Sequence, residues 1–133
     1  MEVKYYDWLE HHEDIRGDKI AIRDLDSKQD ISYRHLNRRA ASLAAYLQSN
    51  GVKKGDRVAL LIRNCPAFFE VQFACSKIGA ICLPLNWRLT PNELNYILND
   101  ATPCALIHDY VFADTAPDLA SACDIGLVLE VRE

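Results

Sequence analysis

The strongest indication of fold in this sequence is a pair of apolar runs, at 80–85 and 104–108, separated by a polar segment that carries helix-start signals. Thr90 suits the N-cap, Pro91 suits the first helical position, and Glu93 stands three residues after the cap, as in a capping box. An apolar run, a short loop, a capped helix and a second apolar run together predict one βαβ unit. The segment therefore predicts an α/β fold with a parallel sheet.

The preceding part of the chain continues this alternation. A continuous apolar run at 58–62 is typical of a strand covered on both faces, and the helix pattern after it opens at Pro66 and stops at Gly79. Because that helix carries apolar residues on more than one face, we expect it to lie between the sheet and a further layer. With a weaker helix at 112–123 and a strand at 125–129, the chain predicts a parallel βαβαβ sheet with helices on both faces.

The N-terminal third predicts smaller elements and one long helix. Residues 6–16 have the spacing of a short amphipathic helix, and 19–23 and 30–32 are strand-like, with a polar turn between them. Ser32 then caps a helix that Gly51 closes. The apolar face of that helix comprises Leu36, Ala40, Leu43 and Leu47.

Composition narrows the functional classes. With 133 residues, the chain is one domain or a part of one. Its net charge of −4 and its lack of a basic patch disfavour a nucleic-acid or anionic-membrane surface. No apolar run approaches the roughly 20 residues that span a bilayer, and no secretory signal opens the chain, so we expect a cytoplasmic protein without a transmembrane segment. The five cysteines form no C-x-x-C pair, which predicts reduced, mostly buried thiols.

Several segments resemble functional motifs but lack the chemistry of those motifs. The segment 51–56 has three residues between its glycines and ends in aspartate, whereas a P-loop needs four and then Lys-Ser/Thr, so it predicts a helix-to-strand turn. His11 and His12 would diverge by about 100° on a helix, which favours a solvated helix face over a metal site. His35 and His108 are single histidines, for which a core or rim position is favoured over catalysis.

Polar residues follow three of the expected strands. In parallel sheets, ligands bind beyond the carboxyl ends of the strands. The polar segments at these ends are 63–64 (Arg-Asn), 86–88 (Asn-Trp-Arg) and 108–109 (His-Asp). Arg88 is the strongest candidate, because a planar guanidinium on a loop beside an aromatic ring suits a phosphate. Its alternative is a structural ion pair with Glu93 or Asp100 on the next helix, and the residues alone favour neither.

Several ordered motifs resemble the adenylate-forming (AMP-binding) superfamily, which includes the acyl-CoA synthetases. Residues 30–36 (DISYRHL) resemble its first core motif, although His35 stands where glutamate is usual. Three later segments resemble the second core motif and the residues that lead into it: 55–59 (GDRVA), 64–66 (NCP) and 77–86 (KIGAICLPLN). The resemblance implies that the residues from 55 onward belong to the parallel sheet of that superfamily's large domain.

A further stretch is typical of the acid–CoA ligases within that superfamily. Residues 86–94 (NWRLTPNEL) resemble their Asn-x-Arg-Leu-Thr-x-x-Glu-Leu pattern, and the resemblance as a whole spans about residues 7–110. It implies that residues 1–133 form the N-terminal subdomain of an acyl-CoA-synthetase-like large domain. The chain ends directly after an expected strand, with no capping element, so we expect this subdomain to be an incomplete piece.

The resemblance also implies a reaction. Family members use ATP and Mg²⁺ to convert a carboxylic acid into an acyl-adenylate, and then transfer the acyl group to the thiol of CoA. Their phosphate loop, ribose-binding aspartate, magnesium-binding glutamate and catalytic lysine lie later in the family's chain, so we assign no catalytic residue and no metal ligand here. In some of these ligases an arginine at the position of Arg88 lies near the nucleotide end of CoA. A CoA phosphate contact by Arg88 is therefore the one cofactor-binding assignment.

We therefore expect an N-terminal fragment of an ATP-dependent acid–CoA ligase that serves as scaffold and makes no acyl-adenylate by itself. ATP, Mg²⁺ and CoA belong to the full-length enzyme, and none of them should bind this fragment tightly. The expected partners are the remainder of the ligase chain, or a partner chain that supplies it, and a small carboxylic acid. Two alternatives stay open: a free-standing remnant that pairs with a separate chain, and a small Rossmann-like nucleotide-binding module.

Overall fold

The computed structural model describes residues 6–132 of the chain. Its helices are α1 (Trp8–Arg16), α2 (Tyr33–Ser49), α3 (Pro66–Ile78), α4 (Pro91–Ala101) and α5 (Ala116–Ala122), with a 3₁₀ turn η1 (Tyr110–Phe112). Its strands are β1 (Ile20–Asp24), β2 (Gln29–Ser32), β3 (Arg57–Leu61), β4 (Ile81–Pro84), β5 (Ala105–Asp109) and β6 (Leu127–Val131). No helix within 6–132 combines the length and the apolar character needed to cross a membrane.

Four of the strands form one parallel sheet in the order β4-β3-β5-β6. Val58 of β3 lies opposite Cys82 of β4 on one side and Ala105 of β5 on the other, and Ala105 lies opposite Leu127 of β6. The chain passes from β3 outward to β4 through α3, and then back across β3 to β5 through α4. The parallel α/β sheet predicted from the sequence is confirmed. The reversal of direction between β3 and β5 creates a topological switch point at their carboxyl ends.

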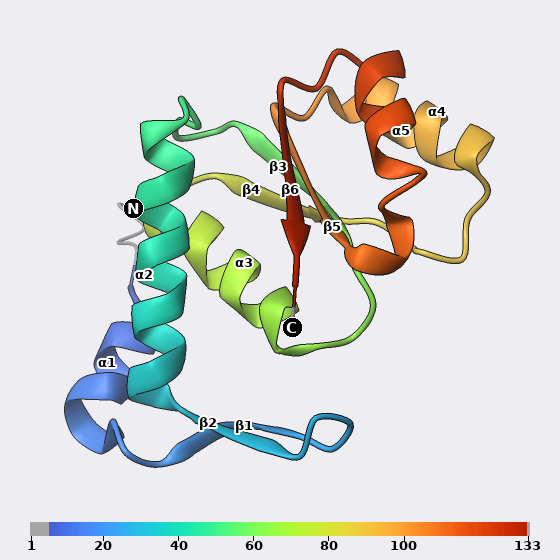
Figure 1. Cartoon of the computed structure of the whole chain (residues 1–133). Helices are drawn as coiled ribbons and strands as arrows, with labels where there is room; N and C mark the ends of the chain where they lie inside the picture. Colours follow the sequence, from blue (N-terminus) through green and yellow to red (C-terminus); the bar gives the residue numbers. More distant parts are fainter. Residues whose placement is uncertain (1–5, 133) are drawn as a thin grey trace.

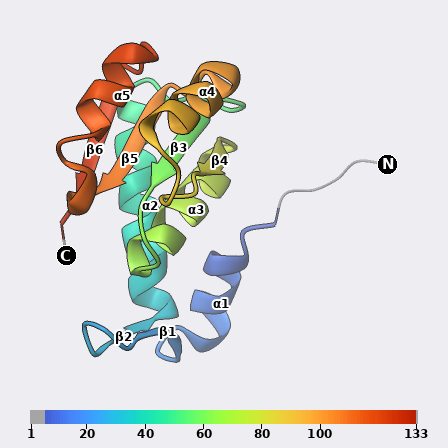
Figure 2. The same ribbon diagram turned by 90° about the vertical axis from the view of Figure 1, so that its right-hand side faces the viewer.

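Helices cover both faces of this sheet. Val58 belongs to the apolar cluster formed with α2 and α3, whereas its neighbour Ala59 belongs to the cluster formed with α4 and α5, because successive side chains of a strand point to opposite faces. Figures 1 and 2 show α2 and α3 on one side of the sheet and α4 and α5 on the other. The further layer expected over α3 is α2, which packs along α3 on the side away from the sheet.

A smaller core joins α1, the antiparallel β1–β2 hairpin and the first half of α2. Its buried residues are Leu9, Ile31, Leu36 and Ala40. Figure 1 shows the hairpin at the end of the molecule toward which β6 points. The tip of the hairpin therefore lies on the side of the sheet where the carboxyl ends of the parallel strands are found.

The helix ends follow their capping residues. α1 begins at Trp8, two residues later than the pattern predicts, because the Asp7 carboxylate accepts the backbone N–H groups of the first turn. Thr90 and Glu93 form the predicted capping box of α4, with Glu93 Oε2 2.8 Å from the Thr90 nitrogen. Gly79 ends α3 in the left-handed conformation, at a φ of 71°. The predicted stop at this glycine is confirmed.

The last two elements differ from the prediction. The helix expected at 112–123 is present as α5 but begins later, at Ala116, and Phe112 belongs to the separate turn η1. Pro117 in the first turn of α5 explains the break, since a proline ring clashes with the carbonyl four residues earlier and prevents a continuous helix. β6 begins at Leu127 instead of residue 125, because the Ile125 N–H bonds to the Ala120 carbonyl at 2.9 Å and ties residue 125 to the end of α5.

Candidate functional site

The switch point brings together two of the predicted polar segments. Arg63 follows β3 and Asp109 ends β5, the neighbouring strand. Arg63 Nε lies 2.7 Å from Asp109 Oδ2, and the carboxylate side chain is 9% exposed whereas that of the arginine is 42% exposed. The guanidinium carbon of Arg63 also lies 5.5 Å from the centre of the Tyr110 ring. The partly exposed Arg63 guanidinium thus pairs with the buried Asp109 carboxylate.

Hydrogen bonds keep this pair charged. Burial raises the pKa of Asp109, whereas the hydrogen bonds that its carboxylate accepts from Arg63 and from the Val111 N–H lower it. The hydrogen bonds together outweigh burial, so the pKa of Asp109 lies below its ordinary value. The hydrogen bond to Asp109 in turn raises the pKa of Arg63. The pair is therefore ionised at neutral pH and fixes the loop after β3 to the end of β5.

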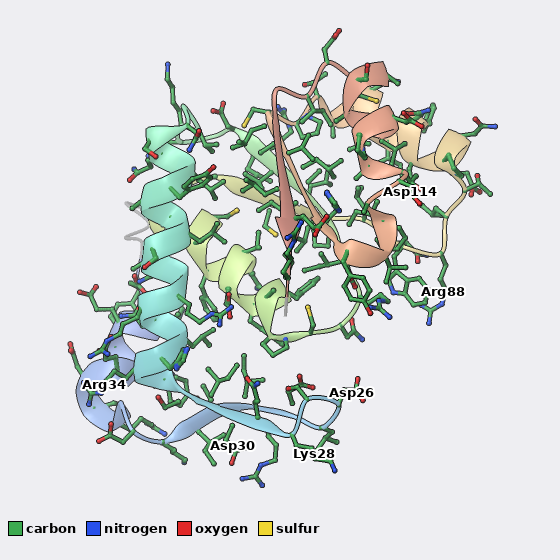
Figure 3. The ribbon with its side chains drawn as sticks, in the orientation of Figure 1. Asp26, Lys28, Asp30, Arg34, Arg88 and Asp114 are labelled. Carbon is green, nitrogen blue, oxygen red and sulfur yellow. The ribbon has the colours of Figure 1, made fainter. Side chains whose placement is uncertain are left out.

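A cavity of about 390 Å³ opens beside this ion pair. Its lining residues are Asp24, Asp26, Ser27, Arg63, Asn64, Cys65, Asp109, Tyr110 and Val131. The first three belong to the β1–β2 hairpin and its turn, and Figure 3 shows Asp26 at the hairpin tip. Sequence reasoning missed this contribution, because a contact between a distant turn and the ends of three strands leaves no local pattern in the chain.

Arg88 lies elsewhere on the same edge, on the loop between β4 and α4. The Asn86 side chain accepts the Arg88 backbone N–H at 3.1 Å, and the guanidinium carbon lies 4.1 Å from the centre of the Trp87 ring. The alternative ion pair with Glu93 or Asp100 is wrong, because no ion pair within residues 6–132 includes Arg88. Figure 3 shows the Arg88 side chain pointing outward from the loop.

This arrangement leaves the Arg88 guanidinium able to bind an anion. Stacking on the indole ring holds the plane of the group, while its N–H edges stay exposed. A planar fork of N–H groups suits phosphates and carboxylates, which accept two parallel hydrogen bonds from it. The surroundings of Arg88 therefore fit a phosphate group.

The other sequence candidates take structural positions. The ring of His12 lies 4.9 Å from the Tyr33 ring and 5.4 Å from the His11 ring, so both histidines belong to an aromatic cluster where α1 meets α2. His108 is buried, and its Nδ1 lies 3.0 Å from a neighbouring backbone carbonyl oxygen. The segment 51–56 is the turn between α2 and β3, as predicted.

Comparison with solved structures identifies the class of protein that this fold defines. The N-terminal domain of FACL13 from Mycobacterium tuberculosis matches 97% of this chain with a TM-score of 0.89 and 25% sequence identity. This chain covers 34% of that one. The fold is therefore that of about a third of the N-terminal domain of acyl-CoA ligases.

Sequence comparison agrees with the structural one. Residues 9–131 match the family described as AMP-binding enzyme. A feruloyl-CoA synthase of Amycolatopsis sp is 45% identical over 91 residues, which are 68% of this chain and 18% of that protein. The 3-oxocholest-4-en-26-oate–CoA ligase of Rhodococcus rhodochrous is 34% identical over all 133 residues, which are 24% of that protein. The chain belongs to the AMP-binding enzyme family, and its resemblance to the N-terminal part of the CoA ligases in that family is confirmed. It spans 18% to 24% of the length of these curated relatives.

Proposed function

We propose that residues 1–133 form the N-terminal subdomain of an ATP-dependent acid–CoA ligase. The family match and the names of the related CoA synthases and ligases support this proposal. They favour it over an unrelated Rossmann-like module. Because those relatives are longer chains, the expected structural partner is the remainder of such a chain. No disulfide joins cysteines within residues 6–132, which suits a location in the reducing cytoplasm.

The proposed reaction has two steps. A carboxylic acid first reacts with ATP to give an acyl-adenylate and pyrophosphate, with Mg²⁺ neutralising the charge of the triphosphate. The thiol of CoA then displaces AMP and gives the acyl-CoA. Residues 6–132 serve this reaction as structure, because they supply a rigid parallel sheet whose carboxyl edge would form one wall of the acid and CoA sites.

One observation carries the proposal to a particular residue. The Arg88 guanidinium is exposed, lies 4.1 Å over the Trp87 ring and has no ion-pair partner among residues 6–132. We expect it to contact a phosphate at the nucleotide end of CoA. A single exposed contact of this kind gives weak binding, so tight binding of CoA or ATP to this chain alone is not expected.

Titration of the chain with CoA tests this assignment. The indole N–H signal of Trp87 in a nitrogen–proton correlation spectrum reports directly on the ring under the guanidinium. We expect it to shift with CoA and with adenosine 3′,5′-bisphosphate, and to stay in place with pantetheine, which lacks phosphate. Arg88→Gln should weaken the response about tenfold, because one charge-assisted phosphate contact is worth on the order of 1.4 kcal/mol.

The matched control is Arg38→Gln, which removes another exposed arginine that lies on α2. Arg38 lies on α2 and not on a loop at the carboxyl edge of the sheet. This variant should therefore bind CoA as the unmodified chain does. Equal losses in the two variants would show a non-specific charge effect and contradict the assignment. An unchanged response in Arg88→Gln would contradict it as well.

A further inference from the structure

Three cysteines lie together on the α2 and α3 side of the sheet. Cys75 is near the end of α3, Cys82 is in β4 and Cys104 directly precedes β5, and all three pack in the same apolar cluster. Of the other two cysteines, Cys65 packs against the same cluster at its far end, and Cys123 does not belong to it. Cys65 precedes the first residue of α3, about 15 Å along the helix axis from Cys75, and Cys123 packs in the cluster on the opposite face of the sheet.

The turn after α3 places Cys75 beside Cys82. Gly79 adopts the left-handed conformation at a φ of 71°, and the Ala80 N–H bonds to the Cys75 carbonyl at 2.9 Å. The chain therefore folds back along the last turn of α3 as it enters β4. Cys75 and Cys82 both pack in the apolar cluster on the α3 side of the sheet, and each thiol shifts the pKa of the other. The two thiols are thus neighbours across the turn.

Cys104 is not placed to form the same pair with Cys82. β3 lies between β4 and β5, with Val58 opposite both Cys82 and Ala105. Neighbouring strands are about 4.8 Å apart, so residues two strands apart are separated by roughly 10 Å, which exceeds the Cα separation of about 7 Å that a disulfide permits. The Cys104 thiol instead lies 3.5 Å from the Arg57 carbonyl oxygen.

The two neighbouring thiols differ in exposure and in acidity. Cys75 is 1% exposed, whereas Cys82 is partly exposed. Interaction with the Cys82 sulfur, together with burial, raises the pKa of Cys75. The same interaction lowers the pKa of Cys82 against the effect of burial. Because the thiolate is the reactive form, Cys82 is the sulfur that meets an oxidant first, and Cys75 is the protonated neighbour behind it.

We propose that Cys82 and Cys75 form a peroxide-sensitive dithiol, a site of reversible oxidation that can join the end of α3 to β4. The Cys82 thiolate attacks one oxygen of hydrogen peroxide, the O–O bond breaks, hydroxide leaves, and Cys82 becomes a sulfenic acid. The Cys75 sulfur then attacks the Cys82 sulfur, the S–O bond breaks, and the hydroxyl leaves with the Cys75 proton as water. The two thiols together lose two electrons, and one peroxide is reduced to two waters.

Peptide mapping of the peroxide-treated chain tests the proposal. After oxidation, free thiols are alkylated, and the chain is digested with trypsin without reduction. Cleavage after Arg63, Lys77 and Arg88 separates Cys75 on 64–77 from Cys82 on 78–88, while Cys104 and Cys123 share 89–132. A Cys65→Ser background leaves Cys75 as the one cysteine of 64–77. We expect peptides 64–77 and 78–88 to be joined by a disulfide that a thiol reductant removes.

Two variants separate the steps. In Cys75→Ser the sulfenic acid at Cys82 has no partner, so dimedone should label residue 82, and in Cys82→Ser no link to 64–77 should form. Oxidation at Cys82 should be at least about tenfold faster than at Cys123, which packs on the other face of the sheet. A link from 78–88 to 89–132 would overturn the proposal. Equal oxidation rates at Cys82 and Cys123 would overturn it as well. That comparison uses the unmodified chain, so it does not require any variant to fold.

Discussion

Two arginines at one edge of the sheet have opposite surroundings. Arg63 donates to the buried Asp109 carboxylate at 2.7 Å, whereas Arg88 stacks on Trp87 and has no carboxylate partner among residues 6–132. A guanidinium bound to a buried carboxylate has a hydrogen-bonding edge occupied, while one stacked on an indole keeps its edges free. Arg63 therefore holds a loop in place, and Arg88 remains available to a ligand.

A third charged residue makes stability depend on pH. Asp7 Oδ2 lies 2.6 Å from Lys77 Nζ, and the two side chains are 17% and 15% exposed. Burial raises the pKa of Asp7, whereas the hydrogen bonds from Lys77 and from the first turn of α1 lower it. The hydrogen bonds together outweigh burial, so the folded-state pKa lies below the ordinary value of 3.8. The resulting stabilisation is complete above the unfolded-state pKa and is lost as the pH falls through the lower folded-state pKa.

We expect Asp7→Asn to reduce the free energy of unfolding by about 1 kcal/mol at neutral pH. Asparagine still caps α1 but does not carry the charge that attracts Lys77. The difference from the unmodified chain should shrink as the pH falls below 3.8, where the Asp7 carboxylate becomes protonated. Urea unfolding at neutral and strongly acidic pH measures both values. A difference of the same size at both pH values would rule out the charged pair as its cause.

Among the elements, α3 depends most on the turn that ends it. Gly79 closes the helix, its carbonyl accepts the Gly55 N–H at 2.9 Å, and β4 begins two residues later at Ile81. One glycine thus stops the helix, contacts the turn before β3 and directs the chain into the neighbouring strand. A residue with a Cβ at this position would be strained in the left-handed conformation, and that Cβ would lie 3.0 Å from Lys54 Cγ.

Gly79→Ala should therefore lower the free energy of unfolding by about 1 to 2 kcal/mol. The matched control is Gly126→Ala, because an added Cβ there meets no atom within 4 Å and the backbone is not left-handed. That control should change stability by no more than about 0.5 kcal/mol. Denaturant titration of both variants gives the comparison, and similar losses in the two would refute the role of the Gly79 turn.

At the scale of the whole molecule, two apolar cores meet along α2. Leu36 in its first half belongs to the small core with α1 and the hairpin, and Leu47 near its end belongs to the core of the sheet. An ion pair between Arg39 of α2 and the buried Glu70 of α3, at 2.6 Å, joins the two helices between these cores. The chain is therefore a continuous support for the carboxyl edge of the sheet.

A support of this kind should be inactive alone. We expect the 133-residue chain to give no ATP–pyrophosphate exchange above background with any carboxylic acid, because its five scattered glycines form no phosphate-binding loop. An acid–CoA ligase that carries all the family motifs serves as the positive control under the same conditions. Acid-dependent exchange by the purified chain would show that the catalytic groups lie within it.

The sequence by itself determined the order and the type of the elements. The bounds of α3 and the capping box of α4 agree with prediction, because proline, glycine and capping side chains act within one turn of the backbone. The resemblance to the CoA ligases was equally visible, since its motifs are contiguous. The later start of α5 was also encoded locally, because Pro117 in its first turn favours a helix start at that point.

Only the tertiary structure decided which side chains meet. Arg39 is half exposed, and it pairs with Glu70 because α2 packs along α3. Arg63 and Asp109 are 46 residues apart and meet because the sheet order places β5 beside β3. The thiols of Cys75 and Cys82 become neighbours where the chain turns from α3 into β4, because both side chains pack in the same apolar cluster. Strand order and helix packing are chosen by the free energy of the whole fold, so no local pattern encodes the contacts that follow from them.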